Sequence, residues 1–205
     1  LKQSPEPRHN LTFSSRSGAG LEIKTALAGD INLSARDIKH IGFAGKIQTT
    51  NSQIKAGELL LSPEIGAEWD TALSLQPELL QIKNLMLSLG KGNQVKLAGE
   101  ISKFSAQPDF RLNLQEAVFN LKEILELAGN PVKPATVDGI LKLANLEVNG
   151  HLQNSQPEMI AISKGSIAID SFSANYPQSA AKIEGARLAV DLQDIKLENL
   201  ALRQV

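Results

Sequence analysis

The chain has 205 residues, 42% of them hydrophobic and 21% charged, with a formal net charge of -1 and no cysteine. This length and composition allow one large folded domain or two small ones. The small net charge argues against binding to a nucleic-acid backbone. The absence of cysteine excludes disulfides, thiolate metal ligands and a cysteine nucleophile.

Residues 1–10 contain two prolines and mixed charge, and we expect them to form a flexible segment. We expect residues 11–205 to form a single elongated domain, with a candidate sub-boundary near residues 130–136. No stretch approaches the ~20 apolar residues of a membrane-spanning helix. The sequence starts at Leu1 without a methionine. We therefore expect a fragment or a processed product, with any membrane anchor or signal outside it.

Apolar and polar residues alternate along most of the remaining chain, which is typical of β-strands with one apolar face. Clusters of Gly, Asn, Ser and Pro separate the alternating segments and are typical of turns. The sequence therefore predicts a mainly β fold, a long curved antiparallel meander of roughly a dozen strands. The alternating segments are Leu21–Leu27, Ile31–Ala35, Phe43–Ile47, Trp69–Leu75, Leu85–Leu89, Val95–Ile101, Phe110–Leu114, Leu141–Leu143, Leu146–Leu152, Met159–Ile162, Ile167–Tyr176, Ala181–Leu192 and Ile195–Leu202.

A weak internal repeat places a glycine between two apolar residues of the same strand face. Such a glycine weakens a strand and often marks a bulge or a bend. Two interpretations stay open: local twisting of a large sheet, or curvature that keeps the apolar face open. The repeat is centred on Gly29, Gly45, Gly99, Gly139 and Gly150.

One segment, near residues 120–129, has the period of an amphipathic helix instead. Asn120 can cap its start, with Glu123 three residues on, and Gly129 suits its end. A helix of about ten residues is marginal alone and must dock on an apolar surface. It is either a plug on the end of the apolar face or an ordinary packing helix. The residues expected to dock are Leu121, Ile124 and Leu125.

No motif for catalysis or for a metal or cofactor site is present. The three histidines, His9, His40 and His151, are far apart in the sequence and are expected on the surface. The Gly90–Asn93 stretch lacks the spacing of a phosphate-binding loop and is predicted to be a hairpin turn. We therefore expect a protein that is not an enzyme and holds neither cofactor nor metal.

The segment Leu79–Gly129 resembles the AsmA-like family of bacterial envelope proteins, which is similar to the TamB-like and bridge-like lipid transfer proteins. The resemblance rests on a strand ending in Leu89-Gly90, the strand Leu97–Ile101, a turn at Gln107–Phe110 and the helix after it. It implies a taco-shaped β-sheet with an apolar groove, located in the periplasm and tethered to the inner membrane by an anchor absent from this chain. It also implies phospholipid traffic to the outer membrane and a role in envelope integrity.

A sheet that is apolar along one face either closes into a sandwich or bends into a trough that holds acyl chains. Each buried CH₂ contributes about 0.8 kcal/mol, so a chain of about sixteen carbons gains on the order of 10 kcal/mol without polar contacts. We expect the trough, with lipid as the partner and no nucleic acid. The alternative is a structural or adaptor module that binds envelope proteins through its strand edges; an enzyme on a β scaffold has least support. The expected groove residues are Leu85, Leu87, Leu89, Val95, Leu97, Ile101, Phe110, Leu112 and Leu114.

Overall fold

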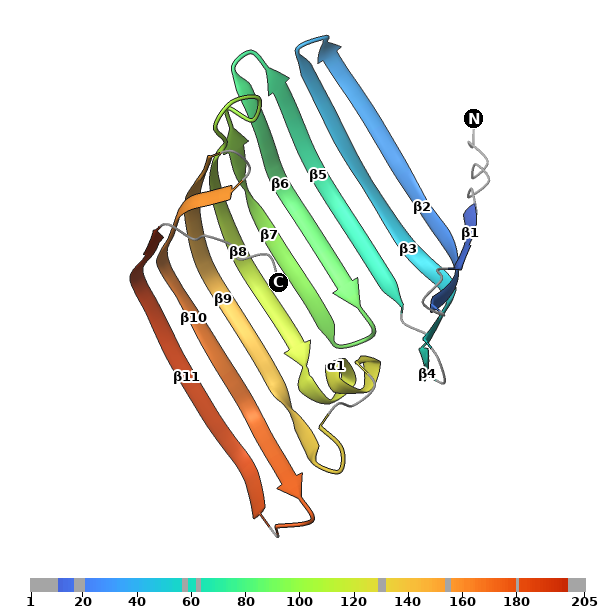
Figure 1. The fold of residues 1–205 in the computed structure, drawn as a ribbon. Coiled ribbons are helices and arrows are strands. Elements are labelled where there is room, and N and C mark those ends of the chain that lie inside the picture. Colours follow the sequence, from blue (N-terminus) through green and yellow to red (C-terminus); the bar gives the residue numbers. More distant parts are fainter. Residues whose placement is uncertain are drawn as a thin grey trace, which may run out of the picture.

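The computed structural model describes residues 11–16, 21–56, 59–61, 64–128, 132–153, 156–179 and 181–198, which form a single curved antiparallel sheet and one short helix (Figure 1). The 11-stranded sheet runs in the order β1-β2-β3-β5-β6-β7-β8-β9-β10-β11, with β4 paired to β3. The predicted antiparallel meander is therefore confirmed. The elements are β1 (Leu11–Arg16), β2 (Leu21–Asp37), β3 (His40–Ala56), β4 (Leu59–Leu61), β5 (Ile65–Leu75), β6 (Glu78–Leu89), β7 (Asn93–Ser102), β8 (Asp109–Asn120), α1 (Leu121–Leu127), β9 (Thr136–Gln153), β10 (Gln156–Tyr176) and β11 (Ala181–Glu198).

Four predicted strand breaks are wrong, because the segments on both sides of each break belong to one continuous strand. In β9 and β11 the break is a residue with positive φ inside the strand, Asn145 (51°) and Asp194 (50°). The apolar–polar alternation changes phase at such a residue. The sequence pattern alone does not distinguish a phase change within one strand from a turn between two strands. β1, β4 and the first half of β6 were not predicted. The expected flexible segment 1–10, Gly129 and residues 199–202 of the last predicted strand lie outside the described residues. The merged segments are those of β2, β9, β10 and β11.

Some of the phase changes are β-bulges, at which one strand carries an extra residue. At others both paired strands carry the extra residue and the register is unbroken. On β6 the apolar positions Ile82 and Leu85 are three residues apart, yet they pair with Gly99 and Leu97, which are two apart. The extra residue returns the next apolar side chain to the same face. The same three-residue spacing recurs in Leu114–Ala117, Leu143–Leu146, Ile162–Gly165 and Leu192–Ile195.

The sheet forms a single layer in the part of the chain that the structure describes. Strands contact their hydrogen-bonded neighbours, and α1 contacts β8 and β9. The only buried apolar side chains there are Ala28 and Ala117, and no large side chain is fully buried. A sandwich would bury large residues between two sheets, so the sandwich alternative is wrong for the described residues.

Two of the repeat glycines lie under aromatic rings of the neighbouring strand. Gly45 pairs with Trp69, and a Cβ on Gly45 would lie 2.6 Å from Trp69 Cζ2. Gly150 pairs with Phe110, whose ring occupies the place of the missing Cβ. These glycines let bulky rings lie across the sheet, which is the arrangement known as aromatic rescue of a strand glycine.

The helix begins as predicted, with the Asn120 Oδ1 accepting a hydrogen bond of 3.0 Å from the Glu123 amide. The Asn120 amide donates to Asn93 Oδ1 at 2.8 Å. The Glu123 carboxylate accepts from the amides of Lys91 and Gly92 at 3.0 and 3.2 Å, and from Asn93 Nδ2 at 2.8 Å. Residues 90–92 form the predicted turn between β6 and β7. Glu123 therefore fastens the helix to this turn.

We predict that Gly45→Ala lowers the free energy of unfolding by about 1–3 kcal/mol, because the new methyl group overlaps the Trp69 ring and lies 2.7 Å from the Asp30 carbonyl oxygen. Gly42→Ala is the matched control on the same strand, since its methyl group meets the Ser34 hydroxyl, which can rotate. Urea denaturation measures both variants. Equal losses in the two would contradict the role of the ring.

We predict that Glu123→Ala costs about 1–3 kcal/mol, because it leaves two turn amides and the Asn93 side chain without their acceptor. Glu126→Ala, one turn of helix closer to solvent, should change stability little. Thermal unfolding followed by circular dichroism compares the two variants, and a smaller loss for Glu123→Ala than for Glu126→Ala would refute the fastening role.

Candidate functional site

The most extensive feature of the sheet is an apolar face built from rows of side chains that cross the strands. Residues opposite one another in an antiparallel pair point to the same face. One row therefore runs from β3 to β11 through directly paired residues. Its members are Ile47, Ala67, Leu87, Val95, Ala117, Leu143, Ile167 and Val190.

Three further rows run parallel to the first on the same face. Glycines aside, Thr71 is their one polar member, and its hydroxyl donates to the Phe43 carbonyl at 2.9 Å. The face is thus apolar over eight consecutive strands. The rows are Gly45, Trp69, Leu85, Leu97, Leu114 and Leu146; Phe43, Thr71, Ile82, Gly99, Leu112, Val148, Ile162 and Ile195; and Ile41, Leu73, Leu80, Ile101, Phe110, Gly150, Ile160 and Leu197.

All nine expected groove residues lie on this face. Leu85, Leu97 and Leu114 are neighbours in one row, and Ile101 pairs with Phe110 in another. The expected set covers only β6, β7 and β8, whereas the face extends over β3, β5, β9, β10 and β11. The expected set missed residues such as Trp69 and Ile167, which the same apolar–polar alternation could have identified. The other members of the expected set are Leu87, Leu89, Val95 and Leu112.

This apolar face is exposed to a degree that is unusual for large aliphatic side chains. Leu33 is 72% exposed, Leu188 59% and Leu87 43%. A monomeric soluble protein rarely exposes a contiguous apolar patch of more than a few hundred Å², and such a patch usually marks a binding surface. The apolar face is therefore the candidate functional site.

The opposite face is polar and carries ion pairs between neighbouring strands. Lys83 lies 3.2 Å from Asp70, Lys164 lies 2.8 Å from Glu147, and Lys142 lies 2.9 Å from Asp170. Exposed pairs of this kind contribute little stability each. They nevertheless fix the direction in which the sheet faces water, because the six charged residues of these pairs lie on the side opposite the rows of apolar residues.

The helix occupies one end of the sheet and does not cover the apolar face. Leu121 approaches β9 at Gly139, where its Cδ1 lies 3.5 Å from the position that a Cβ would take. Ile124 and Leu125 are only half-buried, and no residue of α1 is fully buried. The helix therefore docks at the end of the sheet as expected, but it leaves the rows of apolar residues open.

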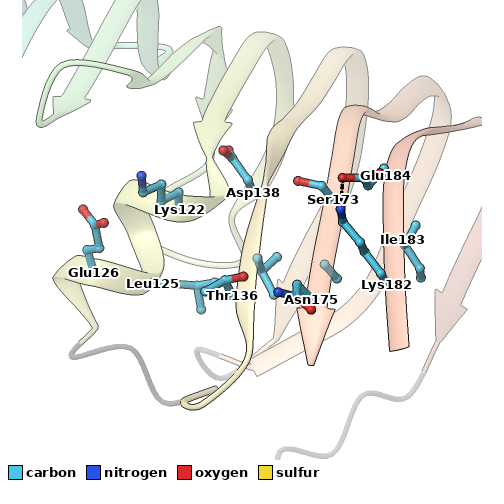
Figure 2. Close-up of a pocket in the computed structure, with 12 residues that line it drawn as sticks. Lys122, Leu125, Glu126, Thr136, Asp138, Ser173, Asn175, Lys182, Ile183 and Glu184 are labelled. Atoms are coloured by element: carbon cyan, nitrogen blue, oxygen red, sulfur yellow. Dashed lines mark ion pairs between the residues drawn. The ribbon is translucent and has the colours of Figure 1, made fainter. Parts of the chain in front are cut away.

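A hollow of about 400 Å³ lies between α1 and the adjoining ends of β9, β10 and β11 (Figure 2). Leu125 borders it from the helix, and Lys182 and Glu184 form an ion pair of 2.5 Å on its far side. Its lining mixes charged, amide, hydroxyl and aliphatic groups, and it holds no histidine. This hollow is separate from the rows of apolar residues.

Several titratable groups of the described residues lie in contact with a partner of opposite charge or with a hydrogen-bond donor. The hydrogen bond to His40 holds the pKa of Asp37 below its usual value, and Ser105 does the same for Glu78. Lys103 and His151 lower the pKa of Asp109, with Lys103 the larger cause. His40 is exposed, as expected, and His151 is partly exposed; each has a carboxylate within hydrogen-bond distance, and His9 lies outside the described residues. Among the described residues, no group of three or more His, Asp or Glu is placed to hold a metal ion.

Comparison with known proteins gave no match, neither to a family model, nor to a curated protein, nor to a solved structure. Among the described residues, no helix is both long enough and apolar enough to cross a bilayer.

The ion pairs of Asp109 predict a specific sensitivity to acid. Its pKa lies below the usual 3.8 in the folded chain, so its stabilising contribution is present above pH 3.8 and is lost as the pH falls through the lower folded value. We expect Asp109→Asn to reduce the loss of thermal stability on acidification below that pH. Melting curves over an acid pH series test this, and identical slopes for Asp109→Asn and the unaltered chain would contradict it.

Proposed function

We propose that the protein binds lipid acyl chains on its apolar face and acts without catalysis. The single observation that carries the proposal is the open face: four rows of aliphatic and aromatic side chains lie on one side of a single-layer sheet, and no described element covers them. Hydrocarbon chains laid on this face would remove water from both surfaces.

The geometry suits long flexible chains better than a compact ligand. Three of the rows cross the strands from β3 to β11 and one from β3 to β9, with strands about 4.8 Å apart, so each row is longer than an extended fatty-acid tail. The rings of Trp69 and Phe110 lie over glycines, so they project less from the apolar face than they would beside a larger residue. Polar groups that would fix one ligand orientation are nearly absent, which favours chains of varied length and saturation over a single shape.

The proposal extends to the setting in which such a surface is useful. The resemblance of Leu79–Gly129 to AsmA-like proteins supports a location in the periplasm and a role in moving phospholipid between membranes. The polar face, with its alternating charges, would stay in water while the apolar face holds the tails. Lipid headgroups would lie at the margins of the sheet, where water is accessible.

Trp69 is the only tryptophan of the chain and lies on the apolar face beside Phe43, with ring centroids 5.4 Å apart. We predict that dibromostearic acid quenches its fluorescence in a saturable manner, whereas stearic acid does not, because bromine quenches only at close range. Titration below the micelle concentration is the measurement. The absence of any quenching would overturn the proposal.

Substitutions on the two faces test the binding surface. We predict that Leu97→Asp weakens dibromostearate binding roughly ten- to a hundredfold, since a buried leucine contributes about 1.5–3 kcal/mol and the new carboxylate opposes burial. Ala98→Asp is the matched control, because the next residue of β7 points to the polar face beside Asn113. Equal losses in both variants would refute the face assignment. Lipid extraction from the purified chain gives an independent reading of the same difference.

A further inference from the structure

The edge strand β11 has a sequence that is nearly symmetric about Ala189. Residues equally distant from Ala189 match in character: Leu188 with Val190, Ala186 with Leu192, and Ile183 with Ile195. On the polar side, Arg187 is matched by Asp191, which has the opposite charge. A strand of this pattern is complementary to an antiparallel copy of itself.

β11 has an open edge in the described part of the chain. It is the last strand of the sheet order and pairs only with β10. An edge strand presents unpaired N–H and C=O groups that can pair with another chain, and proteins commonly block this with proline or with charges on the apolar side. β11 contains no proline, and its regular apolar-face positions carry no charge.

The bulges of β11 fit the same symmetry. Positive φ at Gly185 (64°) and Asp194 (50°) places one change of phase on each side of Ala189, and the pairing with β10 is shifted at Gly185 but unbroken at Asp194. In an antiparallel copy centred on Ala189, Asp194 would face Glu184, and Gly185 would face Gln193. The sheet already contains this arrangement, because Asp194 lies opposite Ser163 of β10 and the register continues on both sides of it. Matched bulges therefore do not prevent pairing.

The charges at the edge are available for a partner. Arg187 is 74% exposed at its side chain, and its Nε lies 3.0 Å from Asp170 Oδ1, the one ion pair that it forms with a described residue. Asp191 is exposed and has no hydrogen bond or ion pair within the described residues. Directly opposite charges of unlike sign on neighbouring strands stabilise the pairing of the strands. Lys182 and Lys196 would also face each other, with Glu184 and Asp194 beside them as counter-charges.

From these observations we propose that two copies of the chain pair through β11 in an antiparallel, two-fold symmetric manner with Ala189 on the axis. The symmetry is that of an isologous interface, in which each residue meets its counterpart in both directions. Two Arg187–Asp191 pairs form on the polar side, and the rows of apolar residues continue from one copy into the next. The proposal stands independently of what the apolar face binds.

A single cysteine tests the register, since the chain has none of its own. Residues opposite each other on the axis have Cα atoms about 4.5–5.5 Å apart, within the range of a disulfide. We expect Ala189→Cys to give a covalent dimer under mild oxidation. Ala168→Cys is the matched control, because Ala168 pairs with Ala189 inside the same chain, one strand from the edge. Equal cross-linking of both variants, or none at residue 189, would overturn the proposal.

Charge reversal tests the interface without cysteine. In sedimentation-velocity experiments we expect a dimer for the unaltered chain and monomers for Arg187→Asp and for Asp191→Arg alone. An equimolar mixture of the two variants, and the double variant, should each restore the dimer, because both contacts between positions 187 and 191 again join opposite charges. Circular dichroism checks that each variant is folded. A monomeric unaltered chain, or variants that dimerise as well as it does, would contradict the proposed pairing.

Discussion

Residues that face each other in an antiparallel sheet must point to the same side, and this constraint decides where nearly every apolar side chain of the molecule lies. Strands of 10 to 21 residues multiply its consequences, because a single slip in register would move a whole set of leucines to the polar side. The bulges satisfy the constraint. Those of β6 and β8 add one residue where the sequence places two polar residues in succession, and the alternation resumes on the correct face.

The arrangement separates two sources of stability that are usually combined in one core. Backbone hydrogen bonds and side-chain contacts between neighbouring strands hold the sheet, while the burial that a second layer would supply is missing from the described residues. Any ligand that prefers the folded face adds its binding free energy to the stability of the sheet. Lipid binding and folding would therefore be coupled in such a protein more strongly than in one with a filled core.

The alternation was sufficient to predict the fold class, the antiparallel order and the common face of residues such as Leu87, Leu97 and Phe110. The helix was also readable, since Asn120 and Glu123 mark its start locally. The strand breaks at Asn145 and Asp194 were misread, because a bulge and a turn share polar residues; the distinguishing signal is an apolar pair three residues apart with no glycine or proline cluster between. The contact of Glu123 with the turn amides depends on residues about 30 positions away, which no local pattern reveals.

In the described part of the chain the strands contact their hydrogen-bonded neighbours in the sheet, and such a layer behaves almost as a one-dimensional chain. Its free energy accumulates strand by strand, so a weakened hairpin near β2 transmits little to β10. Opening starts at the ends and proceeds inward, as in a solenoid, instead of through one concerted collapse. The width of the sheet can then change by the gain or loss of a hairpin, without changes to the other strands.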